Sequence, residues 1–349
     1  LYFPYHEYEP VIRFFEDAVK DQNVTQIKIT QYRVAKKSRI MEALIAAAAQ
    51  GKSVFVFIEV KARFDEAANL AWGEEMEKKG VKVRYSFPGL KVHAKTAIVT
   101  RRVDGETKHY AYLSTGNFHE QTAKIYCDFG FFTSEDKLTL EINRVFSFLE
   151  NTKLPHSSFK HLLVGQFNMN DELKGLIEFE KEQALANKKA KIILKLNNLQ
   201  DTEMIDLLYD ASQAGVEIQL ITRGINCLIP KKPGLSDNIT GISIVDRYLE
   251  HGRVYYFYHD GEEKIFLSSA DWMVRNLDFR IEVACPVNDK SVKKEIDNYL
   301  RILMSDNQKA REHNAFMDNR FITSQNKRVR SQIDFFDYLK SKTDALEIS

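Results

Sequence analysis

The chain has 349 residues, enough for two domains of ordinary size, and 44% of them are hydrophobic, as in globular proteins with substantial cores. Its 50 basic and 49 acidic residues nearly cancel, so a net charge of +1 gives no overall attraction to nucleic acid or to an anionic membrane. A polyanion would therefore need a local basic site, and we expect no nucleic-acid partner. The cysteines Cys127, Cys227 and Cys285 form no C-x-x-C pair, which argues against a disulfide framework or structural zinc.

The terminus and the apolar stretches bear on location. The longest apolar stretch, residues 40–49, contains a glutamate and is too short to cross a bilayer, so we expect no transmembrane segment. No signal peptide is visible, and the chain opens with Leu1 rather than methionine. We therefore interpret it as a fragment of a longer protein. The cysteine usage predicts a reducing, cytoplasmic location, with peripheral membrane association left open.

Strand and helix signals alternate through the first half. Strand-like runs are predicted at 24–30, 53–60, 81–86, 96–100, 109–114 and 128–133. Helical patterns are predicted at about 7–21, 37–50, 65–79 and 136–150. This alternation indicates an α/β fold, with a mixed β-sheet flanked by helices.

The second half repeats the first. Residues 40–63 align with 203–224, and each copy reads as a helix, a glycine stop and a buried strand, with Gly51 falling on Gly215. Many helix–glycine–strand units look alike, so this match alone leaves the duplication about even. The periodic pattern breaks near 151–165. We predict two tandem, duplicated domains, 1–158 and 159–349.

Two polar motifs decide in favour of duplication. The first copy carries K-V-H-A-K (91–95) and then S-T-G-N (114–117), and the second carries E-H-G-R (250–253) and then S-S-A-D (268–271). Eleven residues beyond the last motif position of each copy stands an acid. The matched residues are His93, Lys95, Asn117 and Asp128 in the first copy, and His251, Arg253, Asp271 and Glu282 in the second.

The H-x-K spacing has a chemical reason. Residues i and i+2 of a strand point to the same face, so His93 and Lys95 are presented side by side. Imidazole can attack phosphorus or carry a proton, and a neighbouring cation neutralises phosphate oxygens. A downstream carboxylate, Asp128 or Glu282, can hold the other ring nitrogen of a histidine and fix its tautomer. Most lone histidines of this kind are structural, but two copies in register reverse those odds.

Longer strings carry a family resemblance. Paired H-x-K and downstream Asn motifs resemble the phospholipase D superfamily, and the longer strings resemble the long, multidomain type of polyphosphate kinase. These strings are YRVAKKSRI (32–40), ARFDEAAN (62–69), PGLKVHAK (88–95), STGNF (114–118), LSDNITGISIVDRYLEH (235–251) and LSSADWM (267–273). The resemblance covers the two C-terminal catalytic domains of that family. It implies reversible transfer of the ATP γ-phosphate to polyphosphate, with Mg²⁺, ATP and ADP, in a protein that is a homo-oligomer when full length.

The resemblance also implies residue roles. His93 resembles the histidine that becomes phosphorylated and His251 the second active-site histidine. Tyr126 and Arg223 resemble residues that hold the adenine and the phosphates. Arg33 and Arg63 resemble a pair at the Mg²⁺–phosphate site, but guanidinium only donates hydrogen bonds, so we interpret both as phosphate clamps beside an ion held by phosphates and water.

Two alternatives stay open. A phosphodiesterase of phospholipase D type would carry H-x-K-x-x-x-x-D, whereas Thr100 and Tyr258 stand where that acid belongs. The other alternative is a catalytically silent fragment that binds polyphosphate or supports oligomerisation. The intact motifs around His93 and His251 argue against it.

Overall fold

The computed structural model describes residues 1–60, 66–153, 158–324 and 327–347. The chain divides into two compact units: unit 1 comprises Leu1–Asn170, Ser268–Ala270 and Arg275–Cys285, and unit 2 comprises Asp171–Leu267, Asp271–Val274 and Pro286–Ser349. This division differs from a single cut, because two short segments of the C-terminal half belong to unit 1. The domains 1–158 and 159–349 stay a prediction.

Unit 1 is an α/β unit with these elements in chain order: β1 (Tyr2–Phe3), α1 (Glu9–Lys20), β2 (Val24–Gln31), α2 (Arg39–Ala49), β3 (Ser53–Ile58), α3 (Glu66–Lys78), β4 (Lys82–Tyr85), β5 (Lys91–Val92), β6 (Thr96–Val103), β7 (Glu106–Ser114), the 3-10 helix η1 (Thr122–Lys124), β8 (Tyr126–Thr133), α4 (Asp136–Asn151) and β9 (Leu163–Val164). The C-terminal half adds most of α7 (Val274–Leu277), β16 (Arg280–Ile281) and most of β17 (Val283–Pro286). The strands and helices predicted in the first half are confirmed.

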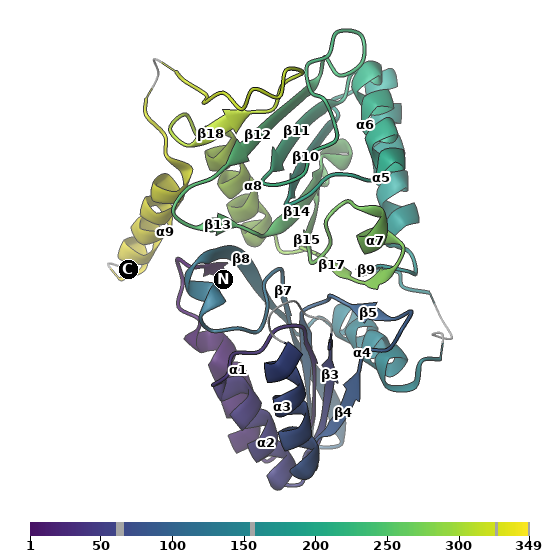
Figure 1. Cartoon of the computed structure of the whole chain (residues 1–349), viewed down its shortest axis with the longest axis vertical. Coiled ribbons are helices and arrows are strands. Elements are labelled where there is room, and N and C mark those ends of the chain that lie inside the picture. The colour runs from purple at the N-terminus through teal and green to yellow at the C-terminus, as the bar shows by residue number, and fades with distance from the viewer. Residues whose placement is uncertain (61–65, 154–157, 325–326, 348–349) are drawn as a thin grey trace. The chain divides into compact units, whose positions relative to one another are not determined.

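The sheet of unit 1 runs in the order β1-β8-β7-β6-β2-β3-β4. Strands β2, β3 and β4 are parallel, and β6 runs antiparallel to β2. Helices α1 and α2 pack with one face of the sheet and α4 with the other, as Figure 1 shows. Burial on both faces explains the nearly continuous apolar run of β3, in which the five residues after Ser53 are all hydrophobic and buried.

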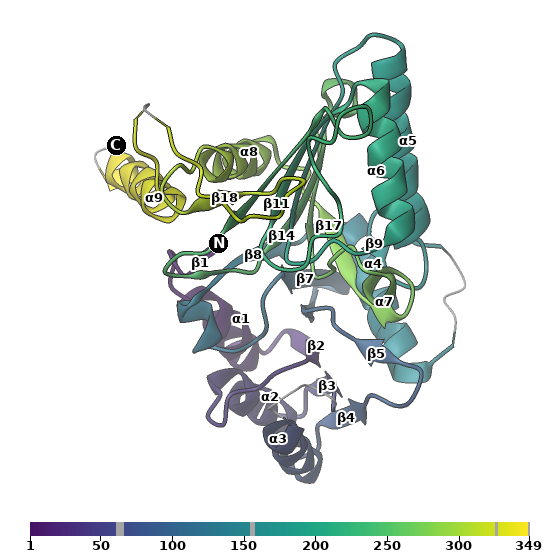
Figure 2. The ribbon, with the colours of Figure 1, turned by 45° about the horizontal axis from the view of Figure 1, so that its top comes forward.

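Unit 2 repeats this plan with α5 (Met169–Leu185), β10 (Lys191–Leu196), α6 (Thr202–Ala214), β11 (Glu217–Thr222), β12 (Ile239–Ile244), β13 (Leu249–Glu250), β14 (Arg253–Phe257), the 3-10 helix η2 (His259–Gly261), β15 (Lys264–Ser268), α8 (Lys290–Met304), β18 (Ala310–Glu312) and α9 (Ser331–Glu347). Its strands follow the order β18-β12-β11-β10-β14-β15. Figure 2 shows α5 and α6 on one face of these strands and α8 and α9 on the other.

The two units share one topology. In unit 2, β10, β11 and β12 are parallel and β14 runs antiparallel to β10, which matches β2, β3, β4 and β6 of unit 1. The aligned helices begin alike, since Ser38 accepts a hydrogen bond from the Met41 amide and Asp201 accepts one from the Met204 amide. Their glycine stops agree as well: Gly51 has φ +83° and Gly215 has φ +107°. The predicted duplication is therefore confirmed.

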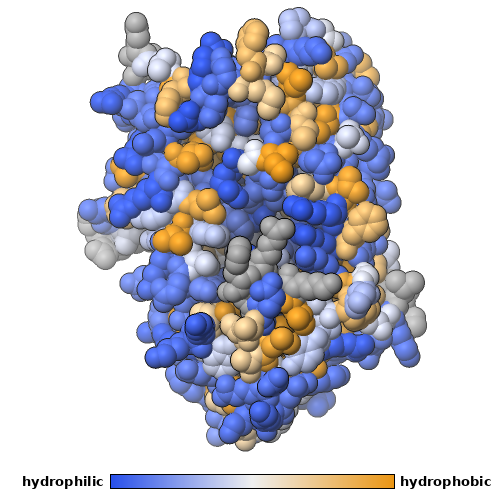
Figure 3. Space-filling model, viewed as in Figure 1, coloured by the Kyte–Doolittle hydropathy of each residue, from blue (hydrophilic) through white to orange (hydrophobic). Residues whose placement is uncertain are grey.

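Within the ranges that the structure describes, none of the helices is both long enough and apolar enough to cross a bilayer. On the face seen in Figure 3, hydrophobic side chains are scattered among hydrophilic ones.

Candidate active site

Backbone contacts with β16 hold the strand end that carries His93. His93 follows β5, which pairs in parallel with β16, so that Lys91 lies opposite Arg280 and Val92 opposite Ile281. The amides of His93 and Ala94 both donate to the Ile281 carbonyl, at 2.9 and 3.0 Å. A segment nearly 200 residues further along the chain therefore fixes the backbone that presents His93.

The imidazole of His93 is paired with a buried carboxylate. Its Nδ1 lies 3.0 Å from the Glu282 carboxylate, and the two side chains are 12% and 0% exposed. Glu282 also accepts hydrogen bonds from Ser269 Oγ and from Asn276 Nδ2. Burial alone would raise the pKa of Glu282, but the attraction and hydrogen bond of His93, the charge of Lys95 and the hydrogen bond from Ser269 outweigh it, so the pKa lies below its ordinary value. The hydrogen bond predicted between Glu282 and a histidine is present; its catalytic role stays a prediction.

Tyr32 contacts both residues of the H-x-K motif. The rings of Tyr32 and His93 meet edge to face, with centroids 4.8 Å apart and planes at 86°. The Lys95 Nζ lies 5.2 Å from the centre of the Tyr32 ring, and the Lys95 residue is 2% exposed. His93 and Lys95 thus share one neighbour. Tyr32 was not predicted as a site residue, because an aromatic residue after a buried strand usually belongs to the core.

The S-T-G-N loop ends β7 next to β8. The Thr115 hydroxyl donates to Asp128 Oδ1 at 2.5 Å, and the Gly116 amide donates to Ser114 Oγ at 3.0 Å. Asn117 is half-buried, and its Oδ1 is buried with no hydrogen-bond partner among the described residues. A buried amide oxygen of this kind is suited to accept from a ligand or water. That Asp128 holds a histidine stays a prediction.

His251 of unit 2 has a different immediate environment. The Arg253 Nη1 lies 3.2 Å from His251 Nε2 and donates to the His251 carbonyl at 2.9 Å. Arg253 also forms a buried ion pair with Asp271, with Nε 3.2 Å from Oδ1. Burial would raise the pKa of Asp271, but Arg253 and hydrogen bonds from Asn197 and Asn198 hold it well below its ordinary value.

Arg33 and Arg223, two of the phosphate-clamp candidates, lie just beyond strand ends. Arg33 stands two residues after β2 and is half-buried. Arg223 directly follows β11, and its Nε donates to Asn197 Oδ1 and to the Glu250 carbonyl, both at 2.9 Å. Tyr126 opens β8 and is half-buried. Arg63 lies outside the described residues.

Asn197 links two of the candidates in unit 2. Its Oδ1 receives the Arg223 bond, while its Nδ2 donates to the His251 carbonyl at 2.9 Å. The structure therefore brings His93, Lys95 and Glu282 together in unit 1, and His251, Arg223 and Asp271 into one hydrogen-bonded group in unit 2. Asn197 was also missed, since no spacing marks it.

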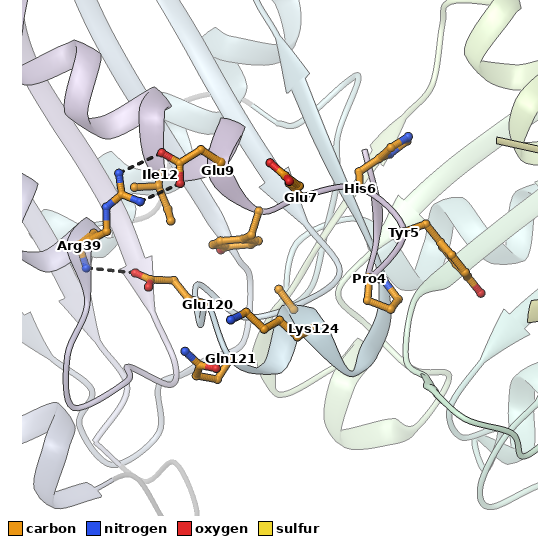
Figure 4. A pocket seen from close by; sticks show the side chains of 12 residues that line it. Pro4, Tyr5, His6, Glu7, Glu9, Ile12, Arg39, Glu120, Gln121 and Lys124 are labelled. Atoms are coloured by element: carbon orange, nitrogen blue, oxygen red, sulfur yellow. Dashed lines mark hydrogen bonds and ion pairs between the residues drawn. The ribbon is translucent and has the colours of Figure 1, made fainter. Parts of the chain in front are cut away.

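A separate cavity of 450 Å³ lies at the start of unit 1. Figure 4 shows Arg39 paired with Glu9, and Glu120 bonded to the Arg39 amide. None of the predicted site residues lines this cavity. The Arg39 guanidinium in it already pairs with the Glu9 carboxylate.

Comparisons with known proteins bear on the family of the chain. Residues 1–155 match the family described as polyphosphate kinase C-terminal domain 1, and residues 162–332 match polyphosphate kinase C-terminal domain 2. The polyphosphate kinases of Escherichia coli (strain K12) and Yersinia pestis are 46% and 47% identical to the chain over 342 residues, which are 98% of this chain and 50% of each relative. The chain spans about half the length of the curated relatives it matches.

Solved structures extend the comparison. The crystal structure of polyphosphate kinase from Porphyromonas gingivalis superposes with a TM-score of 0.93 at 44% identity, covering 99% of this chain and 53% of that one. Phosphatidylserine synthase from Haemophilus influenzae superposes with a TM-score of 0.57 at 11% identity, covering 99% of this chain and 96% of that one. At that identity the second likeness shows a shared fold alone.

Proposed function

This chain belongs to the polyphosphate kinase family, of which it contains C-terminal domains 1 and 2, and from that premise we propose that the whole protein transfers the γ-phosphoryl group of ATP reversibly to polyphosphate through a phosphohistidine at His93. The activity is proposed for the full-length protein, because the relatives are about twice as long as this chain.

The His93–Glu282 hydrogen bond supports the nucleophile assignment most directly. A buried carboxylate on Nδ1 favours the tautomer with the proton on Nδ1 and the lone pair on Nε2. Nε2 would attack the γ-phosphorus, forming an N–P bond as the bond to the bridging oxygen breaks and ADP leaves. A terminal oxygen of polyphosphate would then attack the same phosphorus and release His93. The second step regenerates the neutral imidazole, so the cycle balances.

Basic residues would stabilise the transferred phosphoryl group. Lys95 is proposed to neutralise its oxygens, and Arg33, Arg63 and Arg223 to clamp phosphates, with Tyr126 against the adenine. No cluster of three His, Cys, Asp or Glu residues fit to hold a metal occurs in the described ranges. Mg²⁺ is therefore proposed to arrive with the nucleotide, bound to its phosphates and water.

The remaining polar residues are assigned supporting roles. His251 is proposed as an acid–base residue of the same reaction, with Arg253 and Asp271 fixing its setting. Asn117 and Asp128 are proposed to orient reacting groups in the first copy. The cytoplasmic location and the homo-oligomeric state of the full-length protein stay predictions.

Labelling tests the proposal. Full-length protein incubated with γ-labelled ATP and Mg²⁺ should acquire acid-labile, base-stable label on the peptide that contains His93, and His93→Ala should abolish it. Acid-labile label that persists in His93→Ala would move the nucleophile elsewhere. A protein that hydrolyses phosphodiesters without ATP would favour the phospholipase D alternative, although Thr100, which stands where that family carries an acid, bonds His109 through its hydroxyl.

A further inference from the structure

A buried carboxylate ties the strand ends behind His93 together. Glu59 follows β3 directly and is 2% exposed. It accepts hydrogen bonds from Ser86 Oγ at 2.9 Å and from the Val92 amide at 3.1 Å. A buried carboxylate without hydrogen bonds is strongly destabilising, so the loss of either bond would cost free energy. Glu59 therefore anchors the segment that leads directly into His93.

Asn69 of α3 joins this anchor to the end of β2. It is fully buried, and its Nδ2 donates to the Tyr32 carbonyl at 2.9 Å and to the Glu59 carbonyl at 3.0 Å. Both carbonyls lie just past the ends of their strands, where the ladder no longer satisfies them. Trp72, also on α3, donates to the Ala35 carbonyl at 2.9 Å. The backbone that carries Tyr32 is thus held by side chains of one helix.

The held residue, Tyr32, is the one whose ring meets His93. Rocking of the imidazole about the line from Nδ1 to Glu282 would move Nε2 without breaking the hydrogen bond between Nδ1 and Glu282. The edge-to-face contact with Tyr32, at 4.8 Å and 86°, opposes that rocking. The same ring lies 5.2 Å from the Lys95 Nζ, which favours keeping the cation beside the imidazole.

We propose that Tyr32, whose carbonyl is joined to that of Glu59 by the Asn69 amide, is a positioning residue that orients the His93 ring and the Lys95 ammonium group for phosphoryl transfer. The inference rests on the proposed role of His93 as nucleophile. Tyr32 acts through its ring and not through its hydroxyl, because both contacts are made by the ring. Its effect therefore falls on the alignment of the attacking nitrogen and not on nucleotide binding.

The test compares Tyr32→Leu with Tyr32→Phe in the full-length protein by single-turnover labelling with γ-labelled ATP. Tyr32→Leu should slow the formation of acid-labile label at saturating MgATP by about 10-fold to 100-fold, as expected for a misaligned nucleophile. The final extent of label and the ATP concentration for half-maximal rate should stay within about twofold, because a loss confined to the transition state leaves ground-state binding intact. Tyr32→Phe, which keeps the ring, should label at the wild-type rate.

Tyr110→Leu on β7 is the matched control for loss of an aromatic ring from unit 1, and it should label like the wild type. A purely structural role for Tyr32 would lower the final extent of label and not its rate. If the wild type is labelled on His93 and Tyr32→Leu is labelled equally fast, this inference alone is overturned. Wild-type protein without label on His93 would overturn the proposed function, and the inference with it.

A measurement on the wild type covers the case in which Tyr32→Leu fails to fold. In full-length protein with isotope-labelled histidine and tyrosine, cross-relaxation is expected between the ring protons of His93 and Tyr32. Asn69→Asp removes the bridging amide donor but keeps the side chain near its original size. It should weaken that cross peak and slow labelling. Absence of the cross peak in the wild-type protein would refute the contact and the proposal.

Discussion

Two carboxylate–hydroxyl pairs in unit 1 are built on the same plan, but their acids differ in length by one methylene group. Thr115 donates to Asp128 at 2.5 Å, and Ser269 donates to Glu282 at 2.5 Å. The backbone repeats as well: the amides of Phe129 and Val283 donate to these hydroxyls at 3.0 and 3.1 Å. In each loop a Ser Oγ accepts from the amide two residues on, at 3.0 Å.

The difference lies in the residue beside each carboxylate. A Cβ placed on Gly116 would lie 2.5 Å from Asp128 Oδ2, so the first loop excludes a methyl group. The second loop has the buried methyl group of Ala270 at the same position, and its acid is the longer Glu282. Glycine accompanies the short acid and alanine the long acid. Each loop therefore combines a small residue with an acid of fitting length: Gly116 with Asp128, and Ala270 with Glu282.

The basic partners differ in the same way. Lys95 is matched in the motif by Arg253, and Asn117 by Asp271. The charged Asp271 forms an ion pair with Arg253, whereas the neutral Asn117 leaves its buried oxygen without a described partner. The first copy therefore keeps more polar capacity for a ligand, in line with His93 as the proposed nucleophile.

The largest effect is expected from Glu282→Gln. An amide keeps the size but can present its NH₂ to Nδ1, which favours the wrong imidazole tautomer, so labelling of His93 should slow by about 10³-fold or more. Single-turnover labelling at saturating MgATP measures this. The control is Gln308→Glu, the reverse exchange of the same two side chains in unit 2, which should label like the wild type. Labelling of Glu282→Gln within threefold of the wild type would remove the carboxylate from the mechanism.

Sequence patterns predicted the strands, the helices and the motif positions because these depend on local periodicity and spacing. They could not predict that Glu282 pairs with His93, since that pairing arises from a parallel β5–β16 contact between segments 189 residues apart. Tyr32 and Glu59 were missed for a related reason: their roles depend on strand ends that meet. Alone, Tyr32 reads as ordinary core, and no spacing marks Glu59 as a site residue.

Asp271→Asn tests the charged member of the second copy. Removing one partner of a buried ion pair leaves Arg253 uncompensated, and the free energy of unfolding should fall by about 3–5 kcal/mol at neutral pH. Because the pKa of Asp271 is lowered in the fold, its contribution is fully present above the unfolded carboxyl pKa, about 3.9, and is lost as pH falls below it.

Denaturant unfolding between pH 7 and pH 2 measures this contribution. The gap between wild type and Asp271→Asn should stay constant down to about pH 5 and narrow below about pH 4. The exposed Asp206→Asn on α6 is the control and should change little at any pH. A gap that widens on acidification would contradict the lowered pKa.

Gly116→Ala breaks the match in the first loop. The new methyl group must displace Asp128 or the loop, which should cost about 1–3 kcal/mol of unfolding free energy. Adding Asp128→Glu recreates the alanine–glutamate combination of the second loop and should recover part of the loss. A double-mutant cycle measures the coupling. If the double variant lost more unfolding free energy than the two single variants lose together, the loops would not follow the same rule.

The smallest effect is expected from exchanging the hydroxyl residues, Thr115→Ser and Ser269→Thr. Each replacement keeps the donor to the carboxylate and the acceptor for the following strand, so the net hydrogen-bond energy, about 1 kcal/mol per bond, is retained. Thr115→Ser should change stability only by the lost methyl group, less than about 1 kcal/mol.

Thermal unfolding of both exchanges, beside Thr115→Val and Ser269→Ala, separates the contribution of the hydroxyl group from that of the methyl group. The valine variant strands a buried Asp128 oxygen and the Phe129 amide, so it should lose about 1–3 kcal/mol where the serine variant does not. Equal losses in Thr115→Ser and Thr115→Val would mean that packing, and not the shared hydrogen-bond plan, makes the two loops alike.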